Sequence, residues 1–271
     1  MTNLTVRELE AELLTRFPLS DAEDWDHPGL SVGEPSAEVR AVSCALDASE
    51  RNVRLAAEHG SNVLLTHHPV YLEAPESFTP ADPARASAGA AVYTAARLGV
   101  SIISLHTNLD RSREARERLP SLVGLAAQSS LEHPDDPAAT GLGAICAGPD
   151  CTLGAFAEEL ARAFGTEPRV WGAPELEVGR VAFLGGSLGD FGELALAAGA
   201  QVVVTGEADY HVAQDLALRG CAPVLLGHDR SEEPFVDILA RALRELGLCD
   251  SRIDILVGPR HWWTASEGGC P

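Results

Sequence analysis

Six side chains that can bind a metal ion stand in three short segments, each directly after an apolar run of the chain. They are His67 and His68, His106 and Asp110, and His228 and Glu232. In the second and third segments the carboxylate follows the imidazole by four residues, about one helical turn, which can place both groups on one helix face. Pro69 fixes a turn on which the two adjacent imidazoles can point toward different ions.

Four histidines and two carboxylates are more than the three protein ligands that hold one catalytic zinc. Two ions bridged by a carboxylate account for a set of this size better than one ion does. A mixture of imidazole and carboxylate suits Zn, Mn, Fe, Co or Ni rather than Ca or Mg. In the alternative interpretation each histidine only ends a strand or packs in the core. That alternative is the better one for any single histidine, but the shared placement of the three segments favours metal binding.

The three segments must be positioned by strands and helices that alternate along the chain. Apolar runs predict the strands, and amphipathic stretches, several closed by glycine, predict the helices. This alternation indicates an α/β fold with mainly parallel strands, in which ligands bind beyond the carboxyl ends of the strands. The expected strands are residues 40–47, 62–66, 100–105, 180–184, 201–205 and 222–227, and the expected helices are 5–17, 49–59, 87–98, 153–164, 191–198, 209–219 and 231–246.

The length of the chain and the alternation of strands and helices in both of its halves favour two α/β lobes. We expect residues 1–130 to form the first lobe, completed by residues 222–271, and residues 131–221 to form the second. The proline-rich, acidic stretch His133–Pro137 is the best candidate for a linker. The metal site is expected in the crevice between the lobes, at the carboxyl ends of the strands.

The charge balance excludes several classes of function. The 271 residues include 40 Asp and Glu and 20 Arg but no Lys, for a net charge of −20. Without lysine the chain can form neither a Schiff base nor a P-loop. So much negative charge disfavours nucleic acids and membranes as partners and favours divalent cations. Six scattered cysteines without a CxxC pair, no secretory signal and no long apolar stretch predict a soluble, cytoplasmic protein.

Seven short motifs carry a resemblance to a known family. They are Trp25-Asp26 within Asp24–Gly33, Cys44-Ala45-Leu46-Asp47, Thr66-His67-His68-Pro69, His106-Thr107-Asn108-Leu109-Asp110, Gly185-Gly186-Ser187, Thr205-Gly206-Glu207 with His211, and Gly227-His228-Asp229-Arg230-Ser231-Glu232. In this order they resemble the Nif-three-like dinuclear metal-centre proteins, often catalogued as GTP cyclohydrolase I type 2 homologues. The resemblance covers most of the chain.

The resemblance implies two metal sites that share one bridging carboxylate: His68 with Asp110, His67 with His228, and Glu232 between them. For His106 it implies contact with the substrate or a place beside the ligands rather than direct ligation. It also implies a toroidal homohexamer, hydrolytic opening of the GTP imidazole ring, and the short form of the family, without a domain inserted between the halves.

We therefore expect a dinuclear-metal-dependent hydrolase that acts on a nucleotide-like or phosphorylated small molecule. Two ions lower the pKa of water, and His106 or Glu207 would move the proton. Arginines near the motifs would bind the anionic substrate, and the candidates are Arg111, Arg113, Arg116 and Arg230. The alternative is a non-catalytic metal-binding or regulatory assembly protein, in which the ions hold the lobes together.

Three other features each allow two interpretations. Gly185-Gly186-Ser187 can bind phosphate through backbone N–H groups or can form a tight turn from strand to helix. Glu207 and His211, four residues apart, can join the crevice or solvate the start of a helix. Trp25 and Asp26 are typical packing and turn residues, although the resemblance places their loop near the metals.

Overall fold

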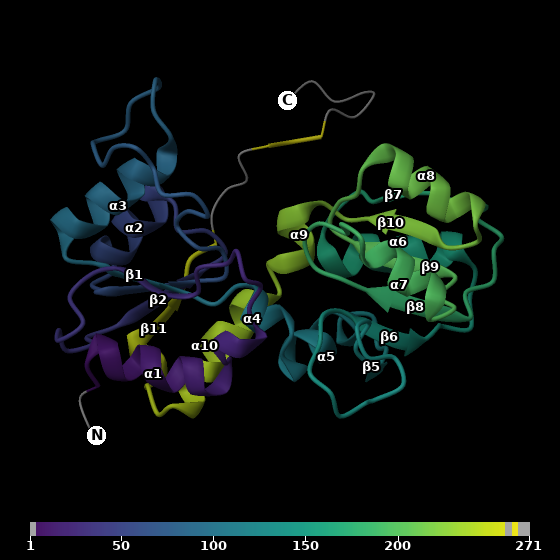
Figure 1. Cartoon of the computed structure of the whole chain (residues 1–271), viewed down its shortest axis with the longest axis horizontal. Coiled ribbons are helices and arrows are strands. Elements are labelled where there is room, and N and C mark those ends of the chain that lie inside the picture. Colours follow the sequence, from purple (N-terminus) through teal and green to yellow (C-terminus); the bar gives the residue numbers. More distant parts are fainter. Residues whose placement is uncertain (1–3, 258–261, 265–271) are drawn as a thin grey trace.

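Two twisted sheets, each with helices packed against it, form two lobes that lie side by side (Figure 1). The computed structural model describes residues 4–257 and 262–264. The central strands of both sheets run parallel. The expected α/β fold with two mainly parallel lobes is therefore confirmed.

The strands of the first sheet are β1 (Gly29–Val32), β2 (Val42–Ala45), β3 (Val63–Thr66), β4 (Ser101–Ser104) and β11 (Ile253–Ile255). Their order is β1-β4-β3-β2-β11. All neighbours are parallel except β1, which pairs antiparallel with β4 at the edge. Every residue of β2, β3 and β4 is buried, as expected for parallel strands covered on both faces.

Four helices cover this sheet: α1 (Val6–Arg16) and α10 (Phe235–Glu245) on one face, α2 (Glu50–Glu58) and α3 (Ser87–Leu98) on the other (Figure 1). A capping box starts α1, in which the Thr5 side chain accepts from the Glu8 N–H and the Glu8 carboxylate accepts from the Thr5 N–H. Helices α2 and α3 bury Val53 and Ala95 against Leu64 and Ile102 of the strands.

The strands of the second sheet are β5 (Ala127–Ser129), β6 (Ala144–Ala147), β7 (Arg169–Val170), β8 (Arg180–Phe183), β9 (Val202–Thr205) and β10 (Ala222–Leu225). Their order is β5-β6-β8-β9-β10-β7, with β8, β9 and β10 parallel and the other strands added antiparallel at the edges. Helix α6 (Leu153–Phe164) packs on one face, and α7 (Phe191–Ala197) and α8 (Tyr210–Leu218) pack on the other.

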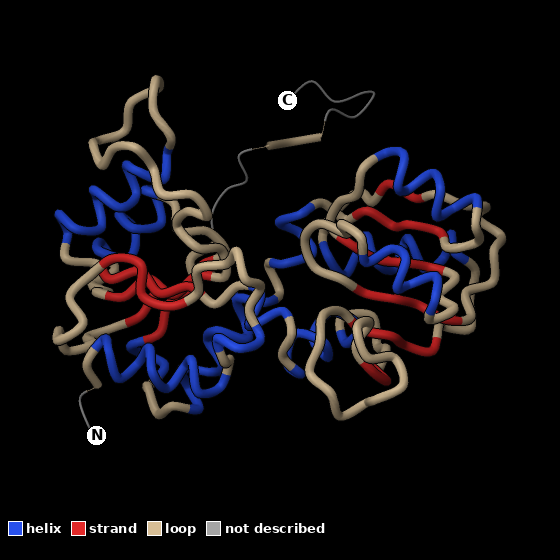
Figure 2. Tube along the Cα trace, in the orientation of Figure 1, coloured by secondary structure: helices blue, strands red, loops and turns tan. Residues whose placement is uncertain are grey.

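One apolar core extends through both lobes. It includes Leu9 and Leu65 of the first lobe and Phe156 and Phe183 of the second. The chain crosses between the sheets twice, through α4 (Thr107–Asp110) and α5 (Arg113–Ser121) after β4, and through α9 (His228–Glu232) after β10. Figure 2 shows these short helices between the two sets of strands. Single 3-10 turns lie at Leu19–Asp21 and Asp250–Arg252.

Most expected elements are present, and three details differ. Helices α4 and α5, which follow β4, were not expected. The helix expected at 231–246 is two helices, α9 and α10, because Pro234 has no N–H with which to continue α9. The antiparallel strands β1, β5, β6 and β7 and the parallel edge strand β11 were not expected. Among the described residues, no helix combines the length and the apolar run needed to cross a bilayer.

The sheets divide the chain differently from the expected boundaries. The predicted linker, His133–Pro137, lies between β5 and β6, which pair with each other inside the second sheet. Ala222–Leu225, expected in the first lobe, pairs in parallel with β9 in the second. The return to the first lobe follows at α10, whose amphipathic face packs on the first sheet.

Phe156 is fully buried and packs edge-on against Phe183, with ring centroids 6.4 Å apart. Phe156→Ala therefore leaves a cavity, and we expect it to lower the free energy of unfolding by about 3–5 kcal/mol in urea titrations. Leu218→Ala is the control, because Leu218 is 78% exposed, and it should change stability by less than about 0.5 kcal/mol. Equal effects of the two substitutions would contradict this account of the core.

Candidate metal centre

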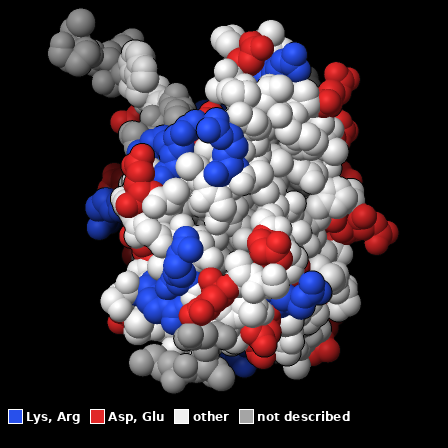
Figure 3. Space-filling model, turned by 90° about the vertical axis from the view of Figure 1, so that its left-hand side faces the viewer, with Lys and Arg blue, Asp and Glu red and all other residues white. Residues whose placement is uncertain are grey.

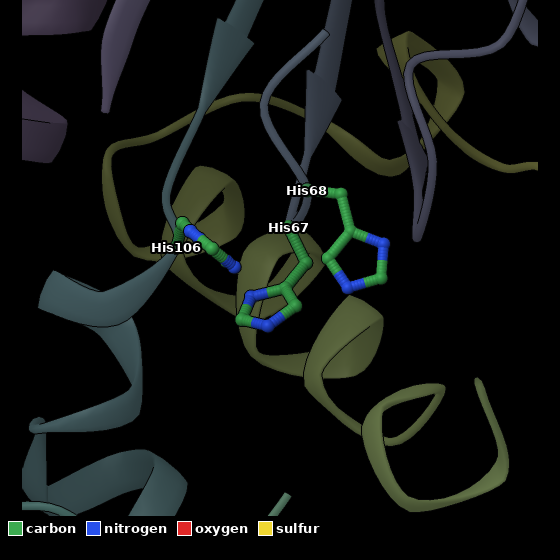
Figure 4. A group of neighbouring side chains, drawn as sticks. All are labelled: His67, His68 and His106. Atoms are coloured by element: carbon green, nitrogen blue, oxygen red, sulfur yellow. The ribbon is translucent and has the colours of Figure 1, made fainter. Parts of the chain in front are cut away.

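Three segments meet where the two lobes face each other. The paired histidines directly follow β3, the next segment follows β4, and α9 follows β10 of the second sheet. Figure 4 shows three of the imidazoles gathered at the ends of β3 and β4. The structure brings together all the ligands predicted from the sequence: His67, His68, Asp110, His228 and Glu232.

Glu232 lies at the centre of the group and only 5% of its side chain is exposed. Its Oε2 lies 2.8 Å from His68 Nε2 and 3.1 Å from His228 Nε2. Its Oε1 lies 3.7 Å from His67 Nε2. The two oxygens of one carboxylate thus face two different sets of imidazoles, which is the arrangement of a bridging ligand.

Each imidazole of the centre has its Nδ1 bound to an acceptor. His67 Nδ1 donates to the Leu105 carbonyl at 3.0 Å, and His68 Nδ1 donates to Asp47 at 2.8 Å. His228 Nδ1 donates to Glu207 at 2.9 Å. Metal-ligating histidines commonly hold their rings in this way, because the bond at one nitrogen turns the other toward the ion. Here Nε2 of all three rings faces Glu232.

Two buried polar atoms of the centre have no hydrogen-bond partner among the described residues. They are His67 Nε2 and Asp110 Oδ1, which lie 3.5 Å apart. The ring of His67 is fully buried, with Phe235 packed against it at a centroid distance of 5.3 Å. A buried polar atom without a partner is costly, and a cation between these two atoms would satisfy both. The residues present therefore fit a metal ion.

The geometry groups the ligands differently from the resemblance. His68 shares Glu232 Oε2 with His228, and these three residues bring ligand atoms within 4.8 Å of one another. His67 instead lies beside Asp110 and Glu232 Oε1. The resemblance instead implies that His68 groups with Asp110 and His67 with His228. Adjacent residues leave a strand in opposite directions, so each histidine joins the ligand that lies on its own side.

His106 approaches the same space from β4. Its Nδ1 donates to Asp26 at 2.9 Å, and a ligand atom of its ring lies within 4.8 Å of those of His67 and His68. The Asp26 side chain is completely buried and also accepts from the N–H and hydroxyl of Thr107. Burial raises the pKa of Asp26, but these hydrogen bonds outweigh it and hold the pKa well below its usual range. Trp25 packs edge-on against His106.

Glu207 and His211 have different positions. Glu207 lies behind His228, on the ring nitrogen that faces away from Glu232. It is therefore placed to orient a ligand rather than to touch a reacting group. His211 is exposed, and its described ring contact is with Tyr210. Sequence reasoning assigned no role to Asp47, whose acceptor function depends on a contact with His68 across 21 positions of the chain.

The structure of the loop Gly185-Gly186-Ser187 favours a tight turn over a phosphate-binding site. A side chain on Gly186 would collide with Glu232, and one on Gly206 would collide with the backbone of Gly186. The Gly186 N–H donates to the Ser231 hydroxyl at 2.9 Å, so it is already used. The glycines allow the loops of the second lobe to approach α9 closely, and they hold Glu232 in place from behind.

A family model described as Duf34/NIF3 (NGG1p interacting factor 3) matches residues 4–258. The chain belongs to the Duf34/NIF3 family. Two relatives named GTP cyclohydrolase 1 type 2 homolog are similar over nearly their whole lengths. The one from Streptomyces coelicolor is 30% identical over 94% of this chain and 92% of its own. The one from Clostridium acetobutylicum is 26% identical over 91% and 93%.

A solved structure shares the fold of this Duf34/NIF3 chain. The crystal structure of a Bacillus cereus protein related to NIF3 superposes with a TM-score of 0.84. The match covers 96% of this chain and 98% of that chain at 20% sequence identity. The family resemblance of the seven motifs is confirmed, and the two-lobed fold agrees with that of a solved NIF3 relative.

Charges in the centre of this Duf34/NIF3 protein favour bound cations. Burial lowers the pKa of His68, but hydrogen bonds to Asp47 and Glu232 raise it to about 10. The hydrogen bond to Glu232 raises the pKa of His228 to about 9. Burial raises the pKa of Asp110 to about 7, despite the attraction of His67. Without a metal, the protons held by His68 and His228 therefore balance the negative charge of Glu232.

The arginines expected to bind substrate in this Duf34/NIF3 chain are mostly engaged elsewhere. Arg111 pairs with Glu23 at 2.7 Å and with Glu132 at 2.8 Å. Arg113 is exposed and pairs with Glu117 on its own helix. The other two are Arg116, which is buried and donates to backbone carbonyls, and Arg230, which pairs with Glu233.

A metal ion must displace the protons on His68 and His228, whose pKa values are about 10 and about 9. We therefore expect metal affinity to rise with pH between 6 and 9, roughly tenfold per pH unit for each proton displaced. Calorimetry in buffers of different ionisation enthalpy counts those protons. Metal binding to the His228→Ala variant should release one proton fewer than metal binding to the wild type. An affinity that stays constant over this pH range would show that the imidazoles are not the ligands.

Proposed function

We propose that this protein is a hydrolase that uses two divalent metal ions to act on a nucleotide-like or phosphorylated small molecule. One observation carries the proposal. The two oxygens of a buried carboxylate, Glu232, face separate sets of imidazole Nε2 atoms. The unpartnered pair of His67 and Asp110 beside them supports it. The ions would be Zn, Mn, Fe, Co or Ni, to which this mixture of donors is suited.

Each ion would be held by its own residues. His67 and Asp110 would hold one, His68 and His228 the other, with Glu232 between the two. Such ions supply Lewis acidity, which lowers the pKa of water and polarises the bond under attack. Asp47 and Glu207 would orient two of the imidazoles through their Nδ1 atoms.

We assign the movement of the proton to His106. Its Nδ1 donates to a buried carboxylate, so the ring is fixed and Nε2 is left to accept a proton near the centre. Asp26 stabilises the imidazolium that forms, because its charge cannot be screened by water in its buried position. Glu207, the other residue expected to move a proton, instead supports His228.

The names of the relatives support a nucleotide-like substrate. Two of them are called GTP cyclohydrolase 1 type 2 homolog, which implies hydrolysis that opens a purine ring and releases formate. The site's own residues support metal-assisted hydrolysis as a class and do not select GTP. Since the five described cysteines form no disulfide, we also propose the reducing cytoplasm as the compartment.

Removing a ligand should remove metal and turnover together. Glu232→Ala should lose both ions, and His68→Ala should lose at least one, as measured by metal analysis per chain. His106→Gln should keep both ions and lower the turnover rate by about 10²–10⁴-fold. Turnover is measured as formate or phosphate released from a panel of nucleotides.

His211→Ala is the matched control, because this exposed histidine contacts Tyr210 instead of the centre. It should retain metal and turnover. Wild-type turnover by metal-depleted Glu232→Ala would refute the two-metal mechanism. Two tightly held ions without turnover of any nucleotide would instead favour a metal-binding assembly protein.

We propose a homohexamer as the assembled state, on the basis of the family resemblance. Size-exclusion chromatography with light scattering should then give six times the chain mass of 28.6 kDa. A monomeric mass at micromolar concentration is the result that would exclude it.

A further inference from the structure

A cleft between the lobes opens beside the metal centre and is lined by His68 and His228. Its volume is about 1460 Å³, more than the ~300–1,000 Å³ of typical small-molecule pockets. The first lobe contributes the start of α2, and the second lobe contributes the end of α6. Parts of α5 and α9, which lie between the lobes, and of α10 complete the lining. The cleft therefore has room for an extended ligand with one end at the metals.

The acidic side chains of this cleft are already engaged. Each of its five described carboxylates accepts a hydrogen bond or forms an ion pair with a neighbouring side chain. The pairs are Asp47 with His68, Glu50 with Arg54, Asp229 with Trp262, Glu233 with Arg230, and Asp237 with Arg118. A His or Arg side chain thus offsets four of the five carboxylates, and the indole of Trp262 donates to the fifth.

Two arginines of the cleft have no such partner. Arg51, in the first turn of α2, and Arg162, in the last turn of α6, are both exposed. Neither makes an ion pair or a side-chain hydrogen bond with residues 4–257 or 262–264. They belong to different lobes, so they approach the cleft from two sides. Figure 3 shows that arginines also stand among the carboxylates on the outer end of the first lobe.

We propose that Arg51 and Arg162 form an anion-binding subsite that holds the phosphate-bearing part of the substrate between the lobes. This inference rests on the proposed function, since the bond to be cleaved would lie at the metal centre. A guanidinium stays charged at any physiological pH, and its planar set of donors matches phosphate oxygens. Two guanidiniums that approach from two sides suit a ligand with a diphosphate or a longer phosphate chain better than a ligand with a single neutral group.

The test uses the full-length, metal-loaded protein and inorganic diphosphate, with calorimetry to measure affinity. Metal per chain is measured before and after each titration. Arg51→Gln and Arg162→Gln should each weaken diphosphate binding about tenfold, and the double variant more than either, because each removes one charge-assisted contact. Arg51→Lys and Arg162→Lys should recover part of the affinity. Arg219→Gln is the control, since Arg219 is already paired with Glu193 and Asp215 on the second lobe.

The outcomes separate this subsite from the metal mechanism. Weaker binding in the Arg51 and Arg162 variants at unchanged metal content supports the subsite, even if no nucleotide is hydrolysed. Diphosphate binding that persists in Glu232→Ala but falls on further removal of Arg51 also supports it. The proposal is overturned if the double variant binds diphosphate as the Arg219→Gln control does, or if the wild type does not bind diphosphate.

Discussion

Glu232 is a carboxylate with 5% of its side chain exposed, enclosed by imidazoles that follow strands of two different sheets. Removing a carboxylate from water costs several kcal/mol unless positive charge and hydrogen bonds compensate. Here the compensation comes from His67, His68 and His228. These interactions lower the pKa of Glu232 well below its usual range against the opposing effect of burial. The contacts of this one carboxylate connect elements of both lobes.

The neighbouring structure follows from that constraint. Gly186 and Gly206 carry no side chain because the loops of the second lobe must approach Glu232 and α9 closely. Phe235, directly after the proline that ends α9, packs on His67 and keeps water from its ring. Each imidazole is also held from behind by an acceptor on a different segment. These bonds set the orientation of each ring and turn Nε2 toward Glu232.

Sequence reasoning placed the candidate ligands together because parallel strands bring their carboxyl ends to one edge, and the histidines stand directly after the strands. It could not pair the ligands, since the residues that lie beside His67 and beside His68 depend on where α4 and α9 pack. Asp47 and Asp26 acquire their roles through contacts with residues 21 and 80 positions away. The short strands β1, β7 and β11 were missed because two to four residues at a sheet edge carry little periodicity.

Proximity to a ligand motif in the sequence also did not predict which arginines are unpaired. Arg111 and Arg113 stand beside a ligand motif, yet carboxylates of neighbouring segments hold both. Arg51 and Arg162 stand near the cleft only because α2 begins and α6 ends there. The charge available at a side chain depends on its neighbours in three dimensions. In a chain with twice as many acidic as basic residues, a carboxylate offsets the charge of most arginines that lie near one.

The division of the ligand set between two sheets has a mechanical consequence. Neither lobe can hold an ion with all of these side chains by itself, so an ion bound by them acts as a crosslink between lobes. By linkage, a ligand present at one hundred times its dissociation constant stabilises the state that binds it by about 2.7 kcal/mol. That free energy would act on the relative position of the lobes, and so on the width of the cleft. The supply of metal in the cell would then govern the stiffness of the molecule as well as its chemistry.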